Sequence, residues 1–100
     1  MLVEFSIFPV GQKSFSKPVA KVIDLIDKSG LSYQTTGMST LIEGDWNRVF
    51  KLIKKCNALL KKEYPRVYGV IKFDDRRGSK KILKSKVDRA EQVLKRKVRR

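Results

Sequence analysis

Histidine is absent from the 100-residue sequence, and cysteine occurs once, as Cys56. Without an imidazole, catalytic arrangements of the Ser-His-Asp and Cys-His kinds are excluded, and so are metal sites built on histidine. A single thiol excludes an internal disulfide and a zinc site made of thiolates, and it fits a reducing compartment. The GxxxxGK(S/T) phosphate loop and the GxGxxG dinucleotide fingerprint are also missing. Few of the common routes to catalysis therefore remain.

Long apolar runs are absent as well. No stretch is long enough to span a bilayer, and the first residues lack the apolar core of a signal peptide. The length fits one domain, and a hydrophobic fraction of 41% is enough for a core. We therefore expect a cytoplasmic protein with a single domain over residues 1–100 and no association with membranes.

Acidic residues are scarce: ten Asp and Glu stand against 24 Lys and Arg, which gives a formal net charge of +14. Residues 71–100 hold thirteen of the basic and four of the acidic residues. Such a segment can bind RNA or another acidic partner, and it can equally be a solvated helix face. The composition favours the solvated face. The alternative function is that of a structural or interaction module whose basic surface contacts RNA or another acidic partner.

Most of the acids have a local explanation in the predicted helices. Four do not: Glu4, Glu43, Asp74 and Asp75. Carboxylates with raised pKa values can transfer protons, but no sequence pattern pairs these four with one another. We therefore expect no catalytic residue, and no metal and no cofactor are expected either.

The apolar pattern predicts four strands and three helices. Alternation and β-branched residues predict the strands, over residues 2–10, 31–44 (a hairpin around Gly37) and 66–74. Apolar residues at helical spacing predict the helices, over residues 16–30, 46–64 and 82–98.

Suitable capping residues stand at the helix ends. Ser16 and Asp45 are the expected N-caps of the first two helices, and Gly30 is expected to end the first in the left-handed conformation. Each helix carries apolar residues on one side, and those of the second helix are expected to be buried. These apolar stripes consist of Val19, Val22, Ile23 and Ile26, of Trp46, Val49, Ile53, Cys56 and Leu60, and of Leu83, Val87, Ala90 and Leu94.

The order β-α-β-β-α-β-α is that of the ferredoxin-like sandwich, an α+β fold, followed by an extra C-terminal helix. Its four-stranded antiparallel sheet carries both main helices on one face and leaves the other face open. The residues expected on the open face are Glu4, Ser6, Phe8, Tyr68, Val70 and Lys72. Because Phe, Tyr and Val make a poor solvent surface, we expect a homo-oligomer in which this face meets another sheet. Glu4 and Lys72 either pair across neighbouring strands or are unrelated surface charges.

Two other groups of proteins share this strand order. Single-strand RNA-binding modules need aromatic residues on the two central strands. The stretch MSTLIEG (38–44), which contains the third strand, has none and carries Glu43, which counts against such a module. Amino-acid-sensing modules bind their ligands at subunit interfaces through a glycine-containing first loop, and Gly11 is compatible with that.

Four stretches together resemble one known family. They are FPVG (8–11), SGLSY (29–33), TLIEGDW (40–46) and IKFDDR (71–76), within a similarity that covers nearly the whole chain. They are similar to the small thiamine-binding-domain proteins of archaea, bacteria and yeast. The resemblance implies a ferredoxin-like fold and association through the sheet into homodimers or homotetramers. It also implies a carrier or sensor that binds thiamine or its hydroxymethylpyrimidine portion, without catalysis.

The resemblance and the chemistry of an aminopyrimidine together indicate a ligand site. Such a ring needs an aromatic or apolar slot and polar groups that read its edge. We expect Tyr33 or Trp46 to stack on the ring and Glu43 to accept from its exocyclic amine. Residues expected to read the ring nitrogens are Ser6, Thr36 and Thr40.

A second group of candidates, Lys72, Asp75 and Arg76, matches the family-like IKFDDR. The hairpin stretch TTGMST (35–40) departs from the Pro-containing turn of the family, which alters the rim of the expected pocket. Structural roles remain as alternatives for several candidates: a core anchor for Trp46, a subunit interface for Tyr33, a surface position for Glu43, and a turn for Asp75 and Arg76.

Overall fold

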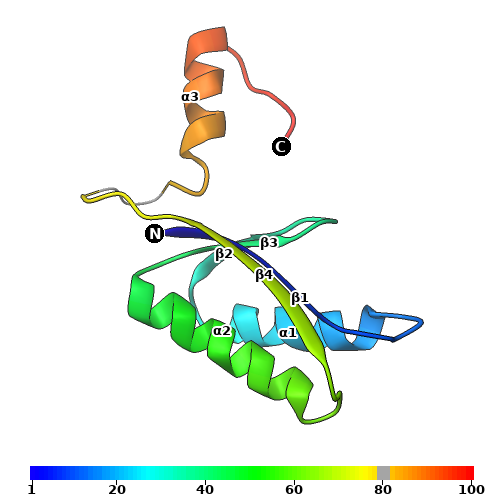
Figure 1. Ribbon diagram of the computed structural model, residues 1–100. Coiled ribbons are helices and arrows are strands. Elements are labelled where there is room, and N and C mark those ends of the chain that lie inside the picture. The colour runs from blue at the N-terminus through cyan, green and yellow to red at the C-terminus, as the bar shows by residue number, and fades with distance from the viewer. Residues whose placement is uncertain (79–81) are drawn as a thin grey trace.

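The computed structural model describes residues 1–78 and 82–100. The elements in chain order are β1 (Leu2–Pro9), α1 (Ser16–Lys28), β2 (Ser32–Thr35), β3 (Thr40–Glu43), α2 (Trp46–Lys61), β4 (Val67–Asp74) and α3 (Ser85–Leu94). The four strands form one antiparallel sheet in the order β2-β3-β1-β4. Helices α1 and α2 lie side by side on one face of it (Figure 1). The predicted α+β ferredoxin-like sandwich with an extra C-terminal helix is confirmed.

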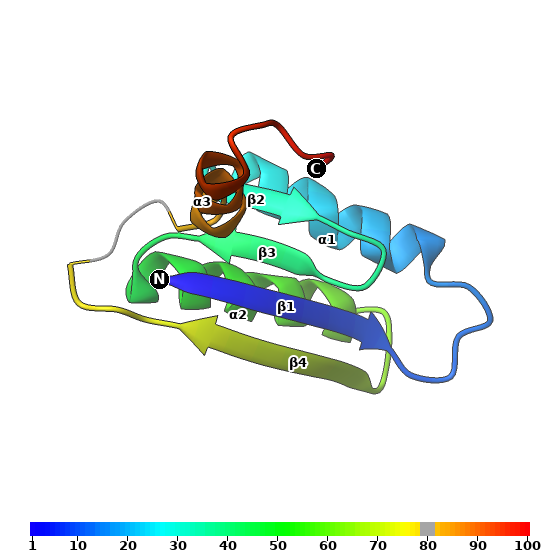
Figure 2. The same ribbon diagram turned by 90° about the horizontal axis from the view of Figure 1, so that it is seen from above.

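The alternation in β1 sorts its side chains between the two faces of the sheet. Val3 and Phe5 are buried under the helices, whereas Glu4 is exposed on the other face. Figure 2 looks onto this open face, with the helices behind the strands. The core between sheet and helices consists of Val3, Phe5, Val22, Ile26, Leu31, Ile42, Val49, Leu52, Ile53, Cys56 and Leu60. Burial raises the pKa of the Cys56 thiol to about 11, so this cysteine packs as a small apolar residue.

Helix α1 ends as predicted but begins differently. Gly30 has φ +78° just after the helix and so provides the left-handed stop. Ser16 is already helical rather than the N-cap, and the residue before it, Phe15, provides no side-chain cap. Instead, the Ser14 hydroxyl accepts from the Ser16 N–H at 3.3 Å. The apolar stripe of α1 is only partly buried, because Val19 in the first turn is exposed.

Helix α2 begins with the predicted cap. The Asp45 carboxylate accepts a hydrogen bond of 2.9 Å from the Arg48 N–H. Trp46, predicted to belong to the buried stripe, is 48% exposed. It lies at the outer edge of the sheet against Phe50 and Phe73, with ring centroids 4.5 and 5.3 Å away. Trp46 therefore lies at the open β4 edge, whereas Val49 in the same turn is fully buried in the core.

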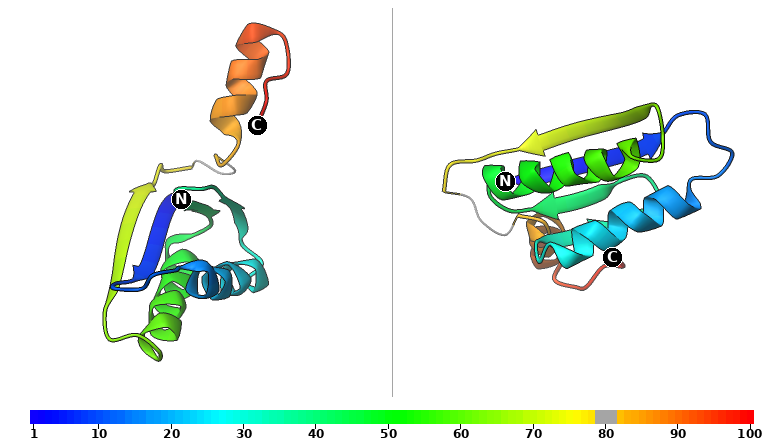
Figure 3. Two further views of the ribbon diagram at one scale, coloured as in Figure 1. Left: turned by 90° about the vertical axis from the view of Figure 1, so that its right-hand side faces the viewer. Right: turned by 90° about the horizontal axis from the view of Figure 1, so that it is seen from below.

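Helix α3 is shorter than the predicted range of 82–98 and buries none of its residues. It ends at Leu94 because Lys95 adopts the left-handed conformation, with φ 57°. The chain then folds back along the helix: the Val98 N–H donates to the Glu91 carboxylate at 2.8 Å, and Arg100 pairs with Glu91 and Asp88. Figure 3 shows α3 standing away from the sheet, on the side opposite α1 and α2. Within residues 1–78 and 82–100, no helix has the length and apolar character needed to cross a membrane.

The Asp45 cap gives a direct test of helix α2. Asp45→Ala removes the acceptor for the Arg48 N–H and should lower the free energy of unfolding by about 1 kcal/mol. Urea denaturation followed by circular dichroism measures this. Asp45→Asn is the control, because asparagine caps a helix about as well. Equal stability of the alanine variant and the wild type would show that the cap is not needed.

Candidate functional site

The two neighbours of β1 pair with it over unequal lengths. β4 pairs with all of β1, from Leu2 to Pro9, whereas β3 pairs with it only from Leu2 to Phe5. Among the described residues, no strand therefore lies against Ser6–Pro9 on the β3 side. A strand left unpaired on one side presents backbone N–H and C=O groups, so this half of β1 can bind a ligand through its main chain as well as its side chains.

A pocket of about 250 Å³ lies at this unpaired half of β1. Its other walls are the N-terminal half of α1 and the turn between β2 and β3. Its lining residues are Phe5, Ser6, Ile7, Phe8, Phe15, Val19, Val22, Ile23, Thr35, Thr36, Gly37, Met38, Ser39 and Thr40. Such a combination of apolar walls with a few hydroxyl groups suits a small, mostly flat organic molecule.

The turn that forms one wall is held by the Thr36 hydroxyl. This hydroxyl donates to the Ser39 carbonyl at 2.9 Å and accepts from the N–H groups of Met38 and Ser39 at 3.2 and 3.1 Å. The Thr36 N–H also donates to the Ser39 carbonyl, at 2.8 Å. Because the hydroxyl proton is already donated within the turn, Thr36 shapes the pocket rather than offering a free donor to a ligand.

Two aromatic rings line the pocket, and one carboxylate lies beside its wall. Phe8 and Phe15 pack against each other with ring centroids 5.4 Å apart. Next to the wall, the Glu4 carboxylate accepts a hydrogen bond of 3.1 Å from the Ser39 hydroxyl. Among the described residues that line the pocket, none is Lys or Arg, although the chain has 24 of them. The local electrostatics therefore favour a neutral or cationic ligand.

Comparison with known proteins identifies the family. A family model described as "Thiamine-binding protein" matches residues 3–91. The chain belongs to this thiamine-binding protein family. The suspected resemblance in the sequence is thereby confirmed.

Similar proteins occur in bacteria and in archaea. A UPF0045 protein of Mycobacterium tuberculosis is 36% identical over 96 residues, which cover 94% of each chain. A UPF0045 protein of Methanocaldococcus jannaschii is 31% identical over 88 residues, covering 87% of this chain and 88% of the relative.

Solved structures agree with the fold of the thiamine-binding protein family. The crystal structure of a hypothetical protein of Methanocaldococcus jannaschii superimposes with a TM-score of 0.81 at 29% identity, covering 91% of this chain and 95% of the other. A Thermotoga maritima protein, titled as a proposed thiamine biosynthesis or salvage protein, gives a TM-score of 0.79 over 89% of this chain and 96% of the other. At 19% identity, the second likeness shows the fold alone.

The three residues expected to read the ring nitrogens are brought together. Ser6, Thr36 and Thr40 all line the pocket, although they come from β1, the turn and β3. Thr40 is buried, and its hydroxyl lies 3.2 Å from that of Thr35. The other six candidates do not line this pocket.

Three candidates lie at the opposite end of the sheet. Glu43 is at the far end of β3, about 10 Å along the strand from Thr40, and its carboxylate accepts from the Leu83 N–H at 2.8 Å. Asp75 and Arg76 follow β4 at that same end, where Arg76 lies 3.4 Å from the Asp74 carboxylate. Of these three residues, Glu43 contacts the C-terminal segment.

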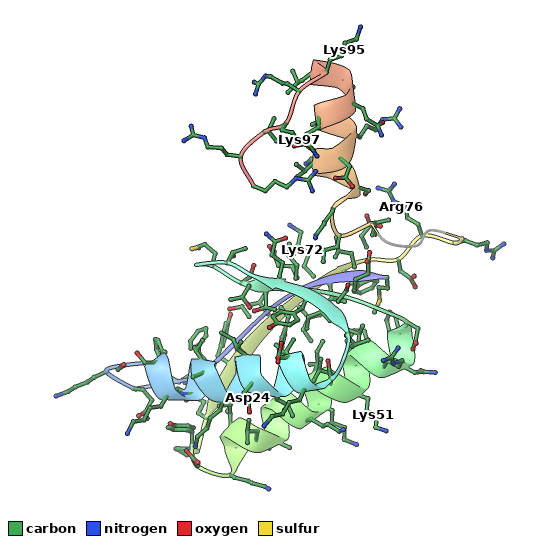
Figure 4. All side chains as sticks on the ribbon, turned by 180° about the vertical axis from the view of Figure 1, so that it is seen from behind. Asp24, Lys51, Lys72, Arg76, Lys95 and Lys97 are labelled. Carbon is green, nitrogen blue, oxygen red and sulfur yellow. The ribbon has the colours of Figure 1, made fainter. Side chains whose placement is uncertain are left out.

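The remaining candidates lie on other surfaces. Tyr33 is on the helix-covered face, and its hydroxyl donates to the Asp27 carboxylate at 2.9 Å, which raises the pKa of Tyr33. Trp46 lies at the β4 edge with Phe73. Lys72 lies directly opposite Glu4 in the β1–β4 register. Figure 4 shows Lys72 on the α3 side of the sheet, and Asp24 and Lys51 on the helix layer.

Sequence reasoning did not assign Glu4, Phe8, Phe15 or Ser39 to the site. Glu4 was among the four acids without a helical explanation, so a signal was present. Phe8 and Phe15 flank the loop around Gly11. A glycine-containing loop between two aromatic residues was therefore a second sequence signal for the site. What the sequence lacked was the pairing between β1 and β3, which brings Ser39 beside Glu4.

The Thr36 network predicts a local change in hydrogen exchange. Thr36→Val removes the acceptor for the N–H groups of Met38 and Ser39, so we expect these amides to exchange about threefold to tenfold faster. Nuclear magnetic resonance measures the rates residue by residue. Thr35→Val is the matched control, because the Thr35 hydroxyl contacts only the Thr40 hydroxyl. Unchanged rates in Thr36→Val would contradict the role of this hydroxyl.

Proposed function

We propose that this protein binds thiamine, or its hydroxymethylpyrimidine portion, in the pocket between β1, α1 and the β2–β3 turn. The observation that carries the proposal is that Ser6, Thr36 and Thr40, the residues expected to read the nitrogens of an aminopyrimidine, line one pocket. Membership in the thiamine-binding protein family supports the ligand class. The proposed role is that of a carrier or sensor, without catalysis.

The chemistry of an aminopyrimidine suits the groups around this pocket. Phe8 and Phe15 offer apolar faces to a flat ring. Ser6 brings a hydroxyl that can donate or accept at a ring nitrogen. The exocyclic amine needs an acceptor, and the Glu4 carboxylate can provide one, because it contacts Ser39, which lines the pocket. The same carboxylate attracts the positive thiazolium of thiamine.

A carrier role fits the absence of an activated nucleophile among the described residues. The only thiol, Cys56, is buried in the core with its pKa raised to about 11, and the chain has no histidine. The hydroxyl groups at the pocket have no neighbouring imidazole that could act as a base. Binding alone is therefore the simplest use of this arrangement.

Calorimetric titration tests the proposed ligand. We expect heat of binding with thiamine or hydroxymethylpyrimidine, and an affinity about tenfold lower in Glu4→Gln, because a hydrogen bond to a charged acceptor contributes roughly 1.5–3 kcal/mol. Glu43→Gln is the matched control at the opposite end of the sheet. Loss of binding in Glu43→Gln alone would show that the ligand binds at that opposite end of the sheet. Absence of heat with either ligand would refute the proposal.

We also propose that the protein associates with itself through β4. Among the described residues, β4 pairs only with β1, so its eight residues leave one long edge free. Ile71 and Phe73 on the helix side of β4 are 43% and 52% exposed, and a largely apolar groove lies between Ile71 and α2. A second β4 pairing with this edge would satisfy the backbone groups and cover these side chains.

Sedimentation velocity tests this association. Wild-type protein should sediment as a dimer or a tetramer at micromolar concentration. Ile71→Lys places a charge on the free edge of β4 and should shift the population toward smaller species. We expect the association constant to fall by about tenfold or more. Ala58→Lys, on the solvent-exposed side of α2, is the control. A wild-type protein that stays monomeric would rule out the β4 association.

A further inference from the structure

A second cavity lies in the helix layer, between the C-terminal end of α1 and the N-terminal half of α2. Its volume is about 360 Å³. Its lining residues are Leu25, Lys28, Ser29, Leu31, Arg48, Lys51, Leu52 and Lys55. None of these residues lines the pocket proposed for thiamine, which involves the other half of α1. The two cavities are therefore separate sites.

The packing of the two helices creates this cavity. Helices α1 and α2 run side by side in opposite directions, so the end of α1 lies beside the start of α2 (Figure 3). The chain leaves α1 through Gly30, and the next residue, Leu31, is buried. Leu31 and Val49 both pack against Gly44, where an added Cβ would lie 3.0 and 3.2 Å from their side chains. Close packing at Gly44 therefore holds the end of α1 next to the start of α2.

The buried part of the lining is apolar. Leu31 and Leu52 are buried, and Leu25 is partly buried against the core. The Ser29 hydroxyl is already used within the chain, because it donates to the Ile26 carbonyl and accepts from the Leu31 N–H at 3.2 Å. The lining side chains that can pair with a polar ligand are therefore the charged ones.

All charged side chains of the described lining are cations. They are Lys28 on α1 and Arg48, Lys51 and Lys55 on α2. The three on α2 stand at positions i, i+3 and i+7, which places them on one side of that helix. Lys28 pairs with Asp24 at 2.9 Å, but no ion pair of the described residues includes any of the other three. Three positive charges thus meet at one cavity without an acidic partner.

The composition of α2 explains why these charges are not neutralised. The helix contains five Lys and Arg residues and no acid. Lys51 and Lys55 are four residues apart, and like charges at this spacing destabilise a helix. An anion that binds beside both ammonium groups would relieve their repulsion. The thiamine pocket has the opposite character, since none of its described lining residues is Lys or Arg.

A phosphate group on a small apolar body matches this lining. A phosphate ester carries nearly two negative charges at about pH 7, and guanidinium and ammonium groups form strong, charge-assisted hydrogen bonds with its oxygens. The leucines require an apolar part, which inorganic phosphate lacks. Ligand pockets span roughly 300–1,000 Å³, so a cavity of about 360 Å³ suits a small molecule.

A nucleic acid fits this part of the surface less well. Binding to its backbone requires cations along a continuous stripe. The neighbouring turns of α1 carry Asp24 and Asp27, both exposed. These carboxylates would repel a polyanion that extends beyond the cavity. Figure 4 shows Asp24 and Lys51 on the same helix layer.

We propose that the cavity between α1 and α2 binds a small, soluble organic phosphate. Arg48, Lys51 and Lys55 hold the phosphate group. Leu25, Leu31 and Leu52 contact the apolar part of the ligand. This site is additional to the proposed thiamine pocket and does not depend on it.

Titration calorimetry of the full chain with phenyl phosphate tests the proposal. We expect saturable binding at millimolar concentration. Inorganic phosphate should bind about tenfold more weakly, because it removes no apolar surface from water. Lys51→Gln should lower the affinity for phenyl phosphate about tenfold, because it removes a charge-assisted hydrogen bond.

Lys54→Gln is the matched control. It removes the same charge from the same helix, but Lys54 lines the groove beside β4 rather than this cavity. Its affinity for phenyl phosphate should equal that of the wild type. Circular dichroism shows whether each variant is folded. In nuclear magnetic resonance spectra, phenyl phosphate should shift the amide signals of Ser29 and Leu31 and leave that of Phe8 unchanged.

Three outcomes would overturn the proposal. Absence of saturable binding of phenyl phosphate would show that the cavity is not a phosphate site. Equal losses of affinity in Lys51→Gln and Lys54→Gln would mean that the net charge of the chain attracts the anion. Single-stranded RNA or anionic lipid vesicles that bind through Lys51, while phenyl phosphate does not, would show that these cations serve a polymer or a membrane instead. None of these outcomes bears on thiamine binding, which is measured separately.

Discussion

The unequal pairing of β1 with its two neighbours is the constraint on which the candidate site depends. β4 accompanies β1 over eight residues and β3 over four. The second half of β1 is therefore an internal edge, and the β2–β3 turn and the start of α1 gather around it. A longer β3 would pair with Ser6–Pro9 and fill the pocket with a strand, so the short hairpin creates the space.

Two groups of functional candidates lie at opposite ends of the sheet. The pocket, with its hydroxyl groups and aromatic rings, lies where β1 ends. The opposite end carries Glu43 and Asp74, which contact Leu83 and Arg76. Carboxylates that seemed equivalent in the sequence therefore have different partners. Glu4 lies between the two ends and contacts the pocket wall through Ser39.

Capping and turn rules correctly predicted those helix ends that depend on residues close together in the chain. Asp45 accepts from the Arg48 N–H because a cap involves residues three apart, and Gly30 ends α1 because only glycine adopts its φ of +78° without strain. Predictions that relied on helical periodicity alone were less accurate. Trp46 fits the spacing of the α2 stripe, but its ring lies at the β4 edge of the sheet. Helix α3 ends early because Lys95 adopts the left-handed conformation.

The sequence by itself determined the elements, their order, the fold class and the family, because alternation, helical spacing and motifs are properties of neighbouring residues. Only the tertiary structure decided which side chains meet. It brought Ser6, Thr36 and Thr40 to one pocket and sent Glu43 to the far end of the sheet. Such groupings depend on the register and length of strands that are distant in the chain, and a shift of register would exchange every contact that defines the site.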